Sequence, residues 1–191
     1  MKKWRIDVGL DFVLVIAVFF CLDTQNMFII AIMAALAHEI GHIIAIWLCG
    51  GYVERVHVGA FGAEIKISPY PMIGYAKEIV IAAAGPLCGA VAAAVAAAFH
   101  AYLFAGLSLV LTLFNLLPAF PLDGGRIVHA AAMLIGGKYA NKVCTAFSAV
   151  AAVAVAAACV VVNIKAGFTL SLTLFCAFII ISFAKNVHND L

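Results

Sequence analysis

The segment of residues 27–49 is apolar except at His38, Glu39 and His42, which form the pattern His-Glu-x-x-His. Residues i and i+4 of a helix project from the same face, so two imidazoles at this spacing can bind one metal ion with the glutamate beside them. Ionisable groups in a membrane-buried helix are costly and face the protein interior or a wet cavity. The segment predicts a zinc site with a neighbouring base. The alternative is structural: the histidines hydrogen-bond to neighbouring helices, and Glu39 is neutral or paired to one of them.

The composition indicates a membrane protein that crosses the bilayer several times. Of the 191 residues, 67% are hydrophobic and only 10% are charged, whereas soluble domains are about half apolar and about a quarter charged. The net charge of +2 and the lack of a basic stripe with interleaved aromatic residues argue against a nucleic-acid partner. The six cysteines include no CxxC pair, which indicates free thiols rather than disulfides or a thiolate metal site.

Six apolar segments approach the length of about 20 residues that a membrane-spanning helix needs. They predict an all-α polytopic fold with six transmembrane helices, the first of them retained rather than cleaved as a signal peptide. We expect residues 1–191 to form a single membrane-embedded domain, with no soluble domain before or after it. The segments are residues 8–22, 27–49, 79–99, 102–117, 141–162 and 168–184.

Residues 53–67, between the second and third spans, change to an alternation of polar and apolar side chains. A glycine-bearing turn at residues 59–62 divides the alternation in two. Period two around such a turn predicts a small membrane-associated β-hairpin. The hairpin either accepts a substrate as an added strand or only plugs the mouth of the site and packs on the helices.

Lysine and arginine residues are distributed unevenly around the six spans. Four basic regions fall on one side of the bilayer, and only Lys165 falls on the other. The positive-inside rule therefore predicts a multi-pass protein of the cell membrane with both termini in the cytoplasm. In this topology the second and fourth spans both run toward the cytoplasm, so the His-Glu-x-x-His motif and Asp123 both lie toward the cytoplasmic half. Pro118 and Pro121 must break the fourth helix before Asp123.

A catalytic zinc ion usually has three protein ligands and one open position. His38 and His42 supply two, and Asp123 is the best remaining candidate for the third. The alternative for Asp123 is a carboxylate that caps the helix starting near Gly124. Glu39 is suited to accept a proton from a water molecule that the metal activates.

The two motifs together resemble the site-2 protease family of intramembrane zinc metalloproteases. The first is His-Glu-x-x-His, and the second is Asn-x-x-Pro-x-x-Pro-Leu-Asp-Gly-Gly at residues 115–125. The resemblance implies one zinc ion per chain, bound by His38, His42 and Asp123, with Glu39 as the general base. It implies a catalytic core at residues 27–126, and it assigns Asn115 and Pro121 to substrate handling. The alternative for Asn115 is a structural role, in which its side chain hydrogen-bonds to carbonyl groups that Pro118 leaves without a partner.

Six spans with both termini inside look most like the branch that includes the sporulation protease, which releases a sigma factor from its membrane-bound precursor. The sequence lacks the CBS domain of that enzyme and the PDZ domains of the envelope-stress branch. We therefore predict a zinc metalloendopeptidase (EC 3.4.24.-) that performs regulated intramembrane proteolysis on a substrate such as a sigma-factor precursor or an anti-sigma factor. The alternative is a non-proteolytic zinc-binding protein, either a metal transporter or an inactive scaffold. The ligands cluster in one half of the bilayer, and Glu39 is superfluous in a pure binding site, so both features favour the enzyme.

Overall fold

The computed structural model describes residues 5–10, 27–59, 62–67, 73–119 and 122–137, with isolated residues between 12 and 17 and between 142 and 164. The chain divides into two compact units, residues 1–113 and 114–191. Its main described elements are β1 (Arg5–Val8), α2 (Met27–Leu48), β2 (Val53–Gly59), β3 (Gly62–Ile67), α3 (Tyr75–Ala98), α4 (Tyr102–Asn115) and α5 (Asp123–Gly136).

Helices α2 and α3 are each long and apolar enough to cross a membrane, whereas α4 is apolar but has only 14 residues. They correspond to the second, third and fourth predicted spans. Helix α2 ends at Leu48. Gly50, two residues later, has a φ of 79° that glycine adopts easily, and the N–H of Gly51 donates to the carbonyl oxygen of Ile46 at 2.8 Å. Helix α3 is continuous through Pro86, so the local opening that a mid-helix proline suggests is not seen.

The predicted hairpin is confirmed, since β2 and β3 pair antiparallel from Val53↔Ile67 to Gly59↔Gly62. The sheet is larger than the predicted hairpin, because β1 pairs parallel with β2 and makes a three-stranded sheet in the order β1-β2-β3. The predicted first span starts at Val8, whereas in the structure Val8 is the last residue of β1. Four alternating residues are too short to identify a strand whose partner lies fifty positions away.

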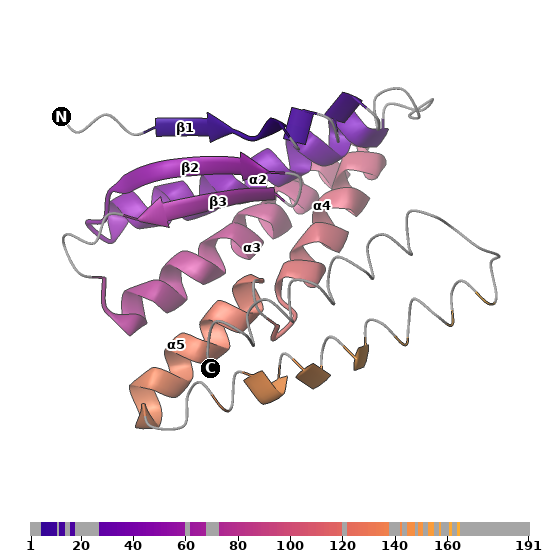
Figure 1. Cartoon of the computed structure of the whole chain (residues 1–191). Coiled ribbons are helices and arrows are strands. Elements are labelled where there is room, and N and C mark those ends of the chain that lie inside the picture. The colour runs from indigo at the N-terminus through magenta and orange to yellow at the C-terminus, as the bar shows by residue number, and fades with distance from the viewer. Residues whose placement is uncertain are drawn as a thin grey trace. The chain divides into compact units, whose positions relative to one another are not determined.

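The sheet lies alongside α2 and α3 (Figure 1). Its apolar side chains Val53 and Ile65 pack against a small core formed by Ala45 and Ile46 of α2 and Ile81 of α3. The hairpin therefore covers the C-terminal half of α2, the half that carries His42.

The second unit begins in the last turn of α4. After Asn115 the chain forms tight turns in which the N–H of Leu117 donates to the carbonyl of Phe114 at 3.1 Å, and that of Leu122 to the carbonyl of Ala119 at 2.8 Å. Helix α5 then starts at Asp123. The predicted break before Asp123 is therefore confirmed.

Several predictions concern residues that the structure leaves undescribed. The first, fifth and sixth predicted spans fall largely or wholly outside the described residues, so the number of six spans stays a prediction. The described part of the chain is mostly helical with a small sheet.

Candidate metal centre

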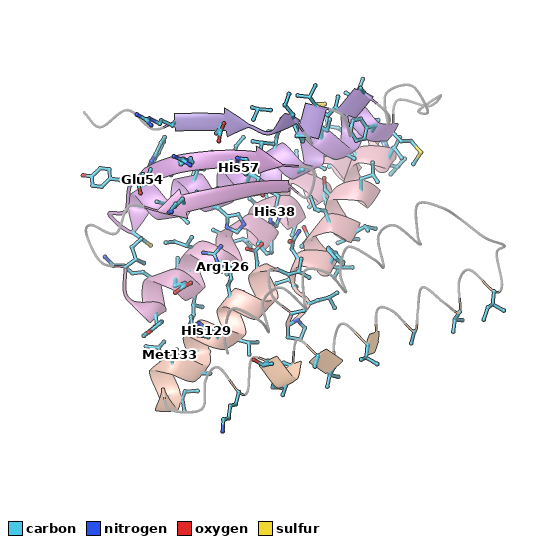
Figure 2. The ribbon with its side chains drawn as sticks, viewed as in Figure 1. His38, Glu54, His57, Arg126, His129 and Met133 are labelled. Carbon is cyan, nitrogen blue, oxygen red and sulfur yellow. The ribbon has the colours of Figure 1, made fainter. Side chains whose placement is uncertain are left out.

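His38 and His42 project from the same face of α2 and are both buried, with 3% and 5% of their surface exposed. Their Nε2 atoms lie 3.2 Å apart, and the two rings meet edge to face at an interplanar angle of 77°. Figure 2 labels His38 on this helix. The i, i+4 spacing has produced the paired imidazoles that the sequence predicts.

The other ring nitrogen of His42 contacts the backbone of α3. Nδ1 of His42 lies 2.8 Å from the carbonyl oxygen of Ile81. A carbonyl oxygen only accepts hydrogen bonds, so Nδ1 carries the proton and donates it. The Nε2 atom of the neutral ring then keeps its lone pair, which is the form that binds a metal.

Gly85 of α3 faces both imidazoles. A Cβ atom at this position would lie 2.8 Å from Nε2 of His38 and 2.5 Å from Cε1 of His42, and it would also collide with Nε2 of His42. Any other residue would occupy the space in front of the two nitrogens. In the sequence, the Gly85-x-x-x-Gly89 pattern indicates close helix packing but does not show that Gly85 adjoins the two histidines.

Two further glycines bring neighbouring helices close to the histidines. A Cβ on Gly41 of α2 would lie 2.7 Å from the Cβ of Cys88, and a Cβ on Gly89 would lie 2.5 Å from Oγ1 of Thr112. The buried Thr112 side chain reaches the Pro86 carbonyl at 3.5 Å. Small residues four positions apart on α3 were the signal in the sequence, because they allow helix backbones to approach closely.

Glu39 follows His38 directly in α2 and is partly buried. On a helix it lies next to the face that carries the two histidines, since each residue advances the helix by about 100°. The predicted base is thus on the same rigid element as the histidine pair.

Asp123 is the first residue of α5, in the second unit, and is buried. Its Oδ1 atom lies 3.6 Å from Nη1 of Arg126, one helical turn on. In the sequence alone, Arg126 is most simply a basic anchor next to lipid headgroups, and the pattern does not indicate this pair. A Cβ on Gly124 would collide with the carbonyl oxygens of Leu116 and Leu117, so this glycine allows the start of α5 to touch the chain that follows α4.

Of the predicted substrate-handling residues, Asn115 is the last residue of α4 and is partly buried, whereas Pro121 lies outside the described residues. His129 lies one turn beyond Arg126 on α5 (Figure 2). The remaining described histidines have local partners: His57 lies 3.4 Å from Asp7, and Nδ1 of His100 lies 2.8 Å from the Tyr102 hydroxyl.

Comparison with known proteins points to one family. Residues 98–161 match the family model of peptidase family M50. A zinc metalloprotease of Methanocaldococcus jannaschii is 31% identical over an alignment of 144 positions, and the match covers 65% of this chain and 42% of that protein. The solved structure of a site-2 protease from Methanocaldococcus jannaschii matches with a TM-score of 0.67 and 22% identity, over 94% of this chain and 89% of that chain.

These likenesses support the site-2 protease (M50) family, and the structural likeness shows the fold. The chain spans less than half the length of the curated relative that it matches. These likenesses do not support the predicted relation to the sporulation branch.

Proposed function

We propose that this chain is an intramembrane zinc metalloendopeptidase that hydrolyses peptide bonds of membrane-embedded proteins. The observation that carries the proposal is the buried pair of Nε2 atoms, 3.2 Å apart, in front of a residue without a side chain. Two nitrogens bound to one tetrahedral zinc ion at their usual bond lengths would be about 3.3 Å apart. The spacing in α2 therefore fits this metal.

The donor set we propose is His38, His42 and Asp123, with one zinc ion per chain. Two imidazoles and a carboxylate are a usual catalytic zinc set, which leaves the fourth position open. The hydrogen bond from His42 to Ile81 supports the proposal, because a metal-binding histidine usually donates its second N–H to a carbonyl or carboxylate. Arg126 would orient the Asp123 carboxylate in the same way.

When bound, zinc would activate a water molecule by lowering its pKa to about 7 and would polarise the peptide carbonyl that the water attacks. Glu39 accepts the proton of that water as the C–O bond forms. It then donates the proton to the nitrogen of the leaving amine as the C–N bond breaks. The backbone of α2 holds Glu39 and the histidines in a fixed relation during both transfers.

The substrate we propose is a single-span or hairpin membrane protein. Its helix must unwind locally, because internal hydrogen bonds cover a peptide bond inside a helix, and the freed backbone groups then need partners in a medium without water. The β2-β3 hairpin offers a strand edge for this purpose. Since β1 already pairs with β2, the outer edge of β3 would take the substrate strand.

This step has its own test, because the hairpin has the alternative role of packing on the helices. Proline substitutions in β3 at amides that face away from β2 should block cleavage while zinc remains bound. Unchanged cleavage would rule out strand addition.

We also propose that Asn115 and Pro121 contact the substrate strand. We propose further that both termini are cytoplasmic, and that sigma-factor precursors and anti-sigma factors are candidate substrates.

The experiment that tests the function compares four purified proteins: wild type, His42→Ala, Asp123→Asn and Glu39→Gln. Zinc content is measured by elemental analysis, and cleavage is measured on a model single-span substrate in detergent micelles. We expect one zinc per wild-type chain, loss or weakening of zinc in the first two variants, and zinc without cleavage in Glu39→Gln.

The same variants distinguish the competing function. A metal transporter or inactive scaffold would bind zinc through the histidines but would not cleave the substrate in any form, and Glu39→Gln would then change nothing. Wild-type protein without zinc, or zinc indifferent to His42→Ala and Asp123→Asn, would contradict the metal centre itself.

A further inference from the structure

The register of the three-stranded sheet aligns three cations that are far apart in the sequence. Arg5 of β1 is the partner of Arg55 of β2, and Arg55 is the partner of Lys66 of β3. Residues directly opposite one another in a sheet project from the same face. With neighbouring strands about 4.8 Å apart, the three backbone positions span about 10 Å.

All three cationic residues are exposed. Among the described residues, no carboxylate forms an ion pair with them. Asp7, two positions along β1, lies near His57, its partner in the next polar row. Like charges directly opposite each other destabilise a sheet. The row of Arg5, Arg55 and Lys66, which we call the basic row, thus carries an electrostatic cost that an anion would remove.

The opposite face of the same sheet is occupied. Ile65 of β3 packs with Val53 of β2 against the core of α2 and α3. The sheet therefore has one face on the helices and one face outward (Figure 1). The register shifts between Val53 and Arg55, so these two residues of β2 face opposite sides, and Arg55 with its partners in the basic row belongs to the outward face.

The basic row also lies close to the end of α2. Strand β2 starts five residues after this helix ends, and Arg55 is the third residue of the strand. Exposed aromatic residues lie at the same end of the structure, near the end of α2 and the start of α3. Trp47 in the last turn of α2, Tyr52 after it and Tyr75 at the start of α3 are 58%, 66% and 39% exposed. Tryptophan and tyrosine gather where a membrane protein passes through the headgroup region.

We propose that the basic row binds the phosphate of an anionic phospholipid headgroup in the leaflet at this end of α2 and α3. Arginine guanidinium groups match phosphate oxygens with two parallel hydrogen bonds, and a lysine adds a compact charge. The aromatic residues at the same level favour a lipid over an acidic segment of a partner protein. The inference requires a bilayer but no proteolysis, so its failure would not contradict the proposed function, and failure of the proposed function would not contradict it.

The test uses the full chain in detergent, titrated with phosphatidylglycerol or with phosphatidylcholine of the same acyl chains. Bound lipid is counted by native mass spectrometry. The test variant is Arg55→Gln with Lys66→Gln, and the matched control is Lys142→Gln, an exposed cation of the second unit. Thermal unfolding of each variant checks that it is folded. Arg5→Gln, which removes the cation that β1 contributes to the basic row, is a second test variant.

We expect wild type and Lys142→Gln to prefer phosphatidylglycerol. Each cation removed from the basic row should weaken this binding about five-fold, and the double variant about 25-fold. Equal binding of the two lipids by wild type would overturn the proposal, as would a folded double variant with undiminished preference. Competition by inorganic phosphate at the same concentration as the lipid would indicate a free-anion site. Displacement of the lipid by a soluble acidic peptide at lower concentration would indicate a protein partner. Either result would also overturn it.

Discussion

Nδ1 of His42 lies 2.8 Å from the carbonyl oxygen of Ile81, so the helix that carries the histidine pair is joined at that pair to the helix packed against it. The contact fixes the tautomer of His42 and the orientation of its ring. Gly85, one turn after Ile81 on α3, leaves room for the same ring. The two helices therefore position together the nitrogens that we propose bind zinc, and changes in α3 should alter zinc binding without replacing a proposed ligand.

Gly85→Ala should abolish or greatly weaken zinc binding, because the added Cβ would collide with the His42 ring and approach Nε2 of His38. Overpacking of this kind costs about 1–3 kcal/mol of folding free energy. Zinc content and thermal unfolding of the purified protein measure the two effects. Gly106→Ala is the control, since nothing lies within 4 Å of its added Cβ. Full zinc content in Gly85→Ala would show that α3 is not held against the histidines.

Gly89→Ala should lower the unfolding temperature, because its Cβ would lie 2.5 Å from Oγ1 of Thr112. The clash involves a single side-chain atom, so adding Thr112→Ala should restore part of the loss. A double-mutant cycle of thermal unfolding measures this coupling, and an interaction of about 1 kcal/mol or more is expected for residues in contact. Simple additivity of the two substitutions would contradict the close packing of α3 against α4.

Gly124→Ala should disturb the start of α5, since the new Cβ would meet the backbone carbonyls of Leu116 and Leu117, which have little freedom to move. If Asp123 is the third zinc ligand, the variant loses zinc or cleavage as well as about 1–3 kcal/mol of stability. Gly136→Ala, in the same helix and free of neighbours, is the matched control. A Gly124→Ala protein with wild-type unfolding would contradict the contact between α5 and the preceding turns.

Lys77→Met should destabilise the protein modestly. The Lys77 ammonium donates to the carbonyl oxygen of Cys49 at 2.8 Å, directly after α2, where a cation interacts favourably with the helix dipole. We expect a loss of about 0.5–1 kcal/mol at low ionic strength, decreasing as salt screens the interaction. Thermal unfolding at two salt concentrations measures it, with Lys142→Met as the control. A loss that does not change with salt would point to packing of the lysine stem instead.

The sequence by itself determined the elements that depend on local pattern. The i, i+4 histidines with Glu39 on one apolar helix, the hairpin of alternating residues and the helix break before Asp123 all follow from spacing and residue type. Each of these features is set by neighbours within about ten positions, which is the range over which helix and strand periodicity operates.

Only the tertiary structure decided which residues surround those elements. Strand β1 is recognised by its pairing with β2, the role of Gly85 by the His42 ring that faces it, and the basic row by a register that joins Arg5, Arg55 and Lys66. None of these relationships is encoded in a local period. They arise because burial of the apolar face of the sheet and close approach of glycine-bearing helices fix the register of distant segments, which a linear pattern does not specify.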